Sequence, residues 1–154
     1  MTISLQRVSN AALDWFHDVG LKEAGALISD EYHAAGGGDL LPRADSIKGV
    51  ENAAQRINRI FSNHDGPRYR VMAESLKEPV LRAMPVMRRS AVTMPDEPIY
   101  LTAIALKEVT EFLNAVNLGA SPRELLKEGK EARDALNKLF NSVIPQTGNL
   151  NATQ

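Results

Sequence analysis

Apolar side chains recur at intervals of three and four residues along most of the chain, which is the spacing of a helix that buries one face. Glycines and prolines interrupt this pattern, and the strict apolar–polar alternation of a half-buried strand is not evident. The sequence therefore predicts an all-α protein. Its expected helices cover 6–18, 21–34, 49–63, 68–77, 79–84, 97–118 and 122–144.

Prolines and polar residues divide this series of helices. Pro85 and Pro95 bound a stretch that we expect to be a linker, 85–96. The sequence thus predicts a helical domain over 1–92, a second helical region over 97–144 and a disordered tail over 145–154.

Residues 119–124 predict a helix end followed by a new helix start. Gly119 suits a C-terminal cap, Ser121 an N-cap, Pro122 the first helical position and Glu124 the third position of a capping box. We therefore expect two helices in 97–144, with one long kinked helix as the alternative.

Composition excludes several classes of chemistry. The chain has no cysteine, which rules out disulfides, a cysteine nucleophile, iron–sulfur clusters and thiolate zinc sites. Its histidines, His17, His33 and His64, lack metal-binding spacing. We expect no catalytic residue, metal or cofactor, and hence no enzyme. No apolar run approaches the roughly 20 residues of a membrane span and no signal peptide is evident, so a cytoplasmic protein without membrane contact is expected.

The net charge of −1 hides an uneven distribution. Residues 1–42 carry a net charge of −4 and residues 91–154 a net charge of −2. Between them, residues 43–90 hold ten basic and five acidic side chains, a net charge of +5, and eight of the ten are arginines. Arginine suits bidentate contacts to phosphate and guanine. This segment predicts a nucleic-acid-binding surface, and a solvated basic surface is the alternative.

The expected helix 49–63 has an apolar stripe and a polar face that suits the reading of DNA bases. Asn52 and Gln55 can pair with adenine. Arg56 and Arg59 can pair with guanine. With 21–34 as the supporting helix, 49–63 would be the recognition helix of a helix-turn-helix domain in the major groove.

Phosphate contacts are expected around this helix. Ser46 and Lys48 lie at its N-terminus, where backbone N–H groups favour an anion. Arg43, Arg68 and Arg70 flank it and would contact the DNA backbone. The loop over 35–48 is about four times longer than the usual 3–4-residue turn of this motif, so the pattern alone leaves an unspecified helical domain open.

The C-terminal helices offer more apolar surface than a hairpin can hide, which favours a homo-oligomer. A symmetric oligomer would read an inverted repeat in double-stranded DNA. The expected contact residues are Leu101, Val109, Phe112, Val116, Leu125, Leu136 and Leu139.

The segment LISDEYHAAGGGDL (27–40) has an acidic and aromatic helix end followed by a glycine triplet, and the polar helix 49–63 comes after it. In this it resembles the YdaT family of lambdoid phage and prophage proteins, over about residues 5–85. The resemblance implies a POU-type helix-turn-helix domain with a long, variable loop before the recognition helix. It also implies a C-terminal helix that assembles into bundles, with a tetramer favoured over a dimer.

Members of that family behave as DNA-binding regulators, functionally like the CII protein of lambda, although the family is often labelled a toxin. The resemblance thus implies a transcriptional regulator of prophage genes that binds a specific operator. Two alternatives stay open. A toxin of a toxin–antitoxin-like module, such as a nuclease, would need an acid–base pair, for instance His64 with Glu74. An adaptor would act through its C-terminal helices alone.

Overall fold

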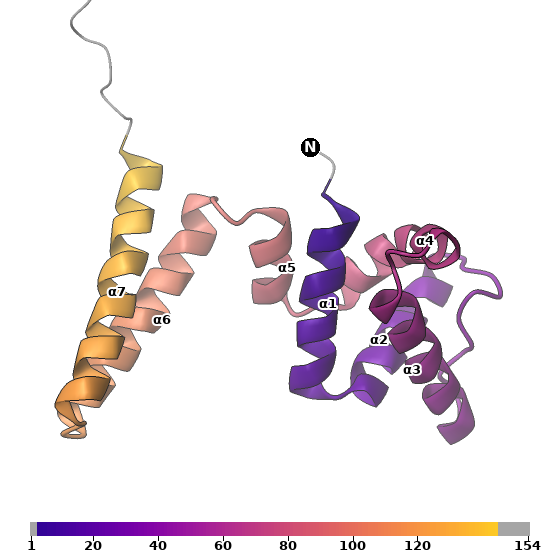
Figure 1. The fold of residues 1–154 in the computed structure, drawn as a ribbon, viewed down its shortest axis with the longest axis horizontal. Helices are drawn as coiled ribbons and strands as arrows, with labels where there is room; N and C mark the ends of the chain where they lie inside the picture. Colours follow the sequence, from indigo (N-terminus) through magenta and orange to yellow (C-terminus); the bar gives the residue numbers. More distant parts are fainter. Residues whose placement is uncertain (1–2, 145–154) are drawn as a thin grey trace, which may run out of the picture. The chain divides into compact units, whose positions relative to one another are not determined.

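The computed structural model describes residues 3–144, which form helices and no strand, and this confirms the all-α prediction (Figure 1). The chain divides into two compact units, Met1–Thr93 and Met94–Gln154. The expected tail, 145–154, lies outside the described residues. The helices are α1 (Leu5–Val19), α2 (Leu21–Ala34), α3 (Ile47–Ser62), α4 (Pro67–Ala83), α5 (Val86–Thr93), α6 (Pro98–Asn117) and α7 (Pro122–Val143).

The first unit has a continuous apolar core between α1, α2, α3 and α4. Trp15 and Phe16 of α1 lie at its centre, and the ring of Phe16 meets that of Phe61 edge-on at 6.0 Å between centroids. Ile57 and Ile60 of α3 are fully buried, so the apolar stripe expected on this helix faces the core. Each such side chain contributes about 1.5–3 kcal/mol on burial.

The helices α2 and α3 cross with their backbones nearly in contact. A Cβ atom added to Gly25 of α2 would lie 2.9 Å from Cα of Ala54 in α3. Only glycine opposite a small residue permits this approach. The crossing therefore sets how α3 is held on α2.

The long loop between α2 and α3 is fixed to α2 at several points. Ser29 Oγ donates to the carbonyl oxygen of Pro42 at 2.6 Å, and His33 Nε2 donates to that of Leu41 at 2.9 Å. Leu41 itself is buried in the core. Gly36 turns the chain with φ of +82°, which glycine adopts without strain. The loop is thus long but anchored, and it delivers the chain to the start of α3.

The structure corrects two sequence-based expectations at the end of this unit. The expected helices 68–77 and 79–84 are one helix, α4, which continues through Pro79. Proline inside a helix removes a hydrogen bond and costs about 3 kcal/mol. Pro79 is buried beside Val80 and Leu81, and this burial offsets the cost.

The expected linker, 85–96, also contains a helix, α5. Val92 of α5 is buried in the core. Arg7 Nη2 donates to the carbonyl oxygen of Ala91 at 3.0 Å, and Arg88 forms an ion pair with Asp18 of α1. These contacts fix α5 on α1. The sequence did not predict α5 because eight residues are too few for a helical periodicity of apolar side chains to be recognised.

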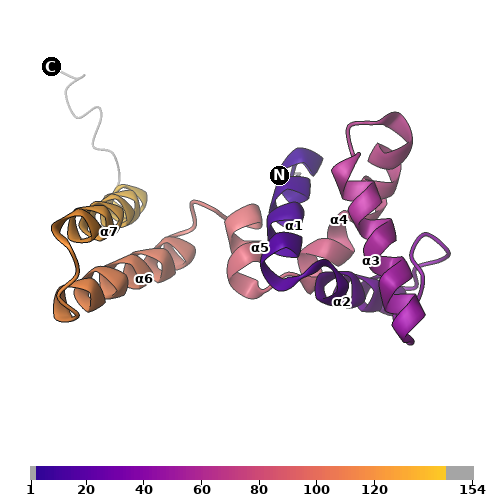
Figure 2. The same cartoon turned by 60° about the horizontal axis from the view of Figure 1, so that its bottom comes forward.

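The second unit is a hairpin of α6 and α7, whose ribbons lie side by side in both views (Figure 1, Figure 2). The predicted break between them is confirmed. Gly119 has φ of +67°, and Ser121 Oγ accepts a hydrogen bond from the backbone N–H of Glu124 at 3.3 Å. Pro122 begins α7. The capping residues were therefore enough to predict two helices in 97–144 instead of one.

Within residues 3–144, no helix combines the length and the apolar character that a membrane crossing requires.

Candidate nucleic-acid interface

The helix α3 begins at Ile47, two residues earlier than expected, because Ser46 caps it. Ser46 has extended backbone angles, and its Oγ accepts a hydrogen bond from the N–H of Gly49 at 3.0 Å. A Cβ atom at Gly49 would collide with the carbonyl oxygen of Arg43, so the loop lies directly on the first turn. Lys48, expected to precede the helix, therefore projects from it.

Four polar side chains form an exposed stripe along α3: Lys48, Asn52, Gln55 and Arg59. Their spacing of four, three and four residues places them on one face of the helix. The opposite face is buried, so a ligand can reach the stripe while the core holds the helix from behind. An α-helix presented in this way fits the major groove of B-DNA.

The other predicted readers and phosphate contacts lie around this stripe. Arg56 is half-buried at its edge, and Arg43 and Ser46 are exposed at the N-terminal end of α3. Arg68 is exposed on the first turn of α4, which follows the C-terminal end of α3, and α3 is about 24 Å long. The structure thus gathers Arg43, Ser46 and Lys48 at the N-terminal end of α3 and places Arg68 after its C-terminal end.

Nine of the ten cations in residues 43–90, all except Arg89, fall into two groups. Lys77 pairs with Glu74 at 3.0 Å, Arg82 with Glu31 at 3.2 Å, and Arg88 with Asp18. The first of these pairs lies within α4, and the other two join α4 to α2 and α5 to α1. Among residues 3–144, no ion pair includes the cations on α3 and beside it, which are Arg43, Lys48, Arg56, Arg59, Arg68 and Arg70. Their charge is available to an anionic ligand.

The acidic residue on α3 is neutralised from α2. Glu51 Oε1 lies 2.8 Å from Lys22 Nζ. The hydrogen bond and the charge of Lys22 lower the pKa of Glu51 below its usual value. Glu51 remains ionised, but the lysine offsets the repulsion that this carboxylate would exert on a phosphate backbone.

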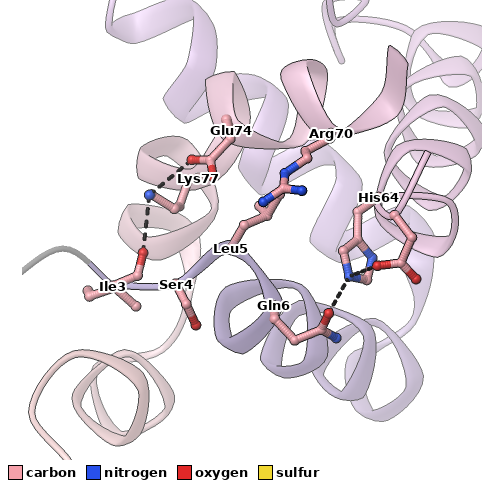
Figure 3. Close-up of a pocket in the computed structure, with 9 residues that line it drawn as sticks. Ile3, Ser4, Leu5, Gln6, His64, Arg70, Glu74 and Lys77 are labelled. Atoms are coloured by element: carbon pink, nitrogen blue, oxygen red, sulfur yellow. Dashed lines mark hydrogen bonds and ion pairs between the residues drawn. The ribbon is translucent and has the colours of Figure 1, made fainter. Parts of the chain in front are cut away.

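His64 and Glu74, the pair required for a catalytic alternative, line one cavity of about 410 Å³ (Figure 3). His64 is buried rather than at the surface. Its Nδ1 lies 2.7 Å from the carbonyl oxygen of Phe61, and its Nε2 lies 3.1 Å from Oε1 of Gln6. Glu74 binds Lys77. Nδ1 holds the ring on the last turn of α3 and Nε2 joins it to α1, so both ring nitrogens have a structural role.

In the part of the chain that the structure describes, no three histidine, aspartate or glutamate side chains gather as metal ligands.

The second unit divides the predicted assembly residues into two groups. Leu101 is buried between α6 and α7, and Phe112, Leu125 and Leu139 are half-buried. Val109 is also half-buried, whereas Val116 and Leu136 are exposed. The predicted set thus contains residues that are buried within the hairpin and residues that are exposed on its surface.

A second apolar row on α6 was missed from the sequence. Ile99, Leu106 and Leu113 repeat every seven residues and are 86%, 68% and 52% exposed. Val109 lies three residues after Leu106 and Val116 three residues after Leu113, which completes a heptad pattern. This row could have been found in the sequence by testing all seven heptad registers of residues 99–116 for apolar repeats. We call these five residues the α6 seam.

A matching row lies on α7: Leu126, Leu136, Phe140 and Val143, all exposed. They occur at heptad positions with Gly129 and Arg133 between them. We call these four residues the α7 seam. The hairpin therefore leaves apolar surface uncovered on both helices.

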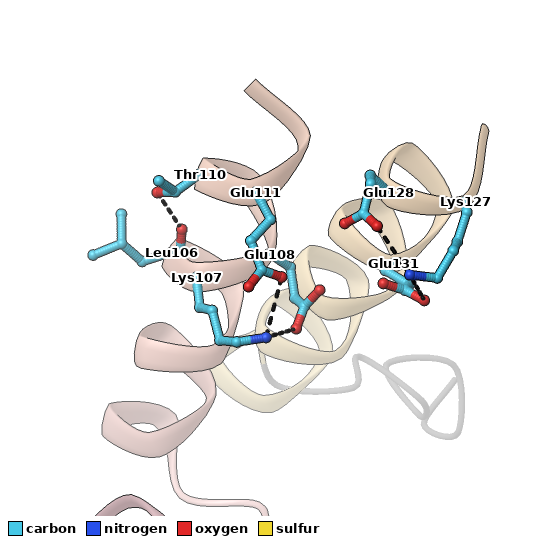
Figure 4. Close-up of polar contacts among 8 residues, drawn as sticks. All are labelled: Leu106, Lys107, Glu108, Thr110, Glu111, Lys127, Glu128 and Glu131. Atoms are coloured by element: carbon cyan, nitrogen blue, oxygen red, sulfur yellow. Dashed lines mark hydrogen bonds and ion pairs between the residues drawn. The ribbon is translucent and has the colours of Figure 1, made fainter. Parts of the chain in front are cut away.

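Another side of the hairpin is ionic (Figure 4). Lys107 lies 3.0 Å from Glu108 and 3.1 Å from Glu111, and hydrogen bonds from both carboxylates raise its pKa. Lys127 binds Glu128 at 2.9 Å in the same way, which raises its pKa as well. The hairpin thus has a solvated ionic side in addition to its apolar seams.

Comparisons with known proteins relate the chain to a protein family and to a phage regulatory protein. Residues 7–136 match the family model described as "Bacterial toxin ydaT". The regulatory protein CII of Enterobacteria phage phi80 is 29% identical over 126 residues, which cover 81% of this chain and 90% of the phage protein. No solved structure matches the chain. Since the family match runs from α1 into the last turns of α7, the chain belongs to the YdaT family.

Proposed function

We propose that this protein is a sequence-specific DNA-binding regulator of phage gene transcription and not an enzyme. The observation that carries the proposal is the exposed stripe of α3, surrounded by cations that make no ion pair within residues 3–144. The similarity to a phage regulatory protein supports it. In this proposal α2 and α3 are the two helices of a POU-type helix-turn-helix, and α3 enters the major groove.

Each side chain of the stripe has a role that follows from its chemistry. Asn52 and Gln55 pair with adenine, and Arg59 pairs with guanine. Arg56, at the edge of the stripe, reaches a second guanine. Lys48, Arg43 and Ser46 hold phosphates at the N-terminal end of α3, and Arg68 holds one at the other end.

The second unit assembles copies of the chain in this proposal. Its α6 and α7 seams are too apolar to remain in water, and a second copy of the hairpin offers the same two seams in return. Two hairpins complete a four-helix bundle. The family resemblance favours a tetramer over a dimer, and Leu118, exposed at the turn of the hairpin outside both seams, is available for a further contact.

Assembly also explains how a small domain gains specificity. A single recognition helix contacts one half-site and binds weakly. A symmetric pair of first units reads an inverted repeat and doubles the number of contacts. The second unit therefore sets the distance between two first units, and with it the spacing of the half-sites, without contacting the bases.

The decisive experiment selects bound sequences from random double-stranded DNA and measures the affinity for the selected operator at several salt concentrations. Gln55→Ala is expected to lower the affinity for the operator by about 5- to 150-fold and to relax one position. Lys48→Ala is expected to weaken binding to all sequences and to reduce the salt slope by about one.

Arg123→Ala is the matched control, because Arg123 is an exposed cation on α7. It is expected to bind the operator like the wild type. If no sequence is enriched, or if all three variants bind alike, the protein is not a regulator that reads DNA through α3.

The second candidate function is a toxin with nuclease activity, favoured only by the cavity that His64 and Glu74 share. The test compares growth arrest by Glu74→Gln and Arg59→Ala at equal expression. A nuclease would lose toxicity with Glu74→Gln, whereas a regulator that is toxic through misplaced DNA binding would lose it with Arg59→Ala.

A further inference from the structure

Ile47 is the first residue of α3, and its side chain is 84% exposed. The other isoleucines of this helix, Ile57 and Ile60, are fully buried. Single exposed apolar residues are common on protein surfaces, so exposure alone carries no meaning. The position of Ile47 is informative, because Ile47 lies next to the polar stripe at the N-terminal end of α3.

The geometry of the helix pair explains why no described part of the chain covers Ile47. Ile47 lies on the same side of α3 as Ala54, two helical turns before it. At Ala54 the helix α2 crosses α3 through Gly25. Ile47 is about 10 Å beyond that crossing, where the N-terminal end of α3 projects past α2 (Figure 2).

The direction of the side chain also favours an external contact. Cα–Cβ bonds of a helix tilt toward its N-terminus, so the side chain of Ile47 extends beyond the first turn. Its neighbours there are polar or charged: Ser46 caps the helix, Lys48 begins the stripe and Arg43 precedes the cap. Asp45, two residues before Ile47, is exposed as well, so Ile47 is an apolar side chain among polar and charged ones.

We propose that Ile47 reads thymine by packing on its C5-methyl group in the major groove. This inference rests on the proposed function. Among the four bases only thymine presents a methyl group there, and an apolar side chain is what distinguishes it. Isoleucine is branched at Cβ and stiff at χ1, so it loses little freedom on contact. In this proposal the polar stripe hydrogen-bonds adenine and guanine, and Ile47 adds an apolar contact to thymine.

The experiment replaces the thymines of the selected operator one at a time by deoxyuridine, which keeps every hydrogen-bonding group and lacks only the methyl. Wild-type protein is expected to lose about fourfold in affinity at one position of each half-site, the effect of one buried methyl group. Ile47→Ala is expected to lose a similar amount on normal DNA and nothing further on the deoxyuridine operator. Its own selected operator should lose the preference for thymine at that position.

Val71→Ala is the matched control. Val71 is also an exposed apolar residue of the first unit, at 69%, but it lies on α4. This variant is expected to retain the full response to deoxyuridine. The inference is overturned if the wild type tolerates deoxyuridine at every position, or if Ile47→Ala responds to it as the wild type does.

The same experiment separates this inference from the proposed function. If the wild type selects an operator but ignores the thymine methyls, only the role of Ile47 is wrong. If it selects no operator, the proposed function fails and the role of Ile47 falls with it.

Discussion

The two units of the chain handle their apolar residues in opposite ways. The first unit surrounds Trp15, Phe61 and Ile57 completely and exposes a charged helix face. The second unit has few buried side chains and exposes two rows of large apolar ones. The first unit covers its own apolar side chains, whereas the second leaves apolar rows exposed. This contrast supports the proposal that the first unit recognises DNA and the second assembles copies of the chain.

The tryptophan makes this comparison measurable. Trp15 is the single tryptophan of the chain and is buried in the first unit. Its fluorescence reports unfolding of that unit alone, while light scattering reports the association that we propose for the second. The predictions below use these two signals.

The largest effect is expected from charges placed in the α6 seam. Leu106→Asp combined with Leu113→Asp should weaken association at least a hundredfold, because each copy would bury two carboxylates in an apolar interface. Light scattering should then give the mass of one chain. The unfolding midpoint from Trp15 fluorescence should not change.

Asn114→Asp is the control for these charges, since Asn114 is exposed on the ionic side of α6. It should keep the wild-type mass. A double variant that also keeps the wild-type mass would show that the α6 seam is not an interface.

The second effect contrasts two phenylalanines. Phe61→Ala should destabilise the first unit by about 3–5 kcal/mol, since it opens a cavity beside Phe16. Phe140→Ala removes an exposed ring of the α7 seam and should leave the first unit unchanged while it weakens association. Urea titrations followed by Trp15 fluorescence measure the first, and light scattering over a dilution series measures the second. Equal losses of stability would mean that the two units fold as one.

The third effect contrasts two helical glycines. Gly25→Ala should cost about 1–3 kcal/mol, because its Cβ would meet the backbone of Ala54 and the helices must move apart. Gly129→Ala should instead stabilise the hairpin by up to about 1 kcal/mol through helix propensity. Its Cβ would lie 3.2 Å from the ring of Phe112, a side chain that can shift. Fluorescence for the first unit and circular dichroism for the second should show opposite signs.

The smallest effects concern pH and also differ between the units. The pKa of Glu51 is lowered by Lys22, so this pair stabilises the first unit above the ordinary value of 4.5 and loses its contribution as pH falls through the lowered pKa. The pKa of Lys107 is raised by Glu108 and Glu111, so that cluster stabilises the hairpin below 10.5 and loses its contribution as pH rises through the raised pKa.

Both groups are exposed, so the contributions are small. Urea titrations of Glu51→Gln should differ from wild type above pH 4.5 and converge with it in acid. Those of Lys107→Met should differ below pH 10.5 and converge in alkali. A difference that is constant with pH would exclude the ion pairs as its source.

The sequence predicted the features that depend on local chemistry. The caps at Gly119 and Ser121 placed the turn of the hairpin, and the spacing of Asn52, Gln55 and Arg59 placed them on one helix face. Helix α4 could not be predicted in one piece, because only tertiary burial offsets the cost of Pro79.

The limits were similar at the two surfaces. Periodicity showed that α6 and α7 are apolar but not which row faces the partner helix and which faces water, so Leu101 and Val116 were grouped together. The formal charge of the basic segment did not show that Arg82 and Arg88 are used in ion pairs within the fold. Ile47 lay outside the expected helix, and its exposure follows from where α2 crosses α3.

The central claim is that the first unit binds DNA and the second unit assembles the chains. It is tested most directly by the ratio of the affinities for the full inverted repeat and for one half-site. The wild type should prefer the inverted repeat by at least a hundredfold. The variant with Leu106→Asp and Leu113→Asp should bind a half-site as the wild type does and gain nothing from the second half-site. If this variant keeps the preference for the inverted repeat, assembly through the second unit is not what reads the operator's symmetry.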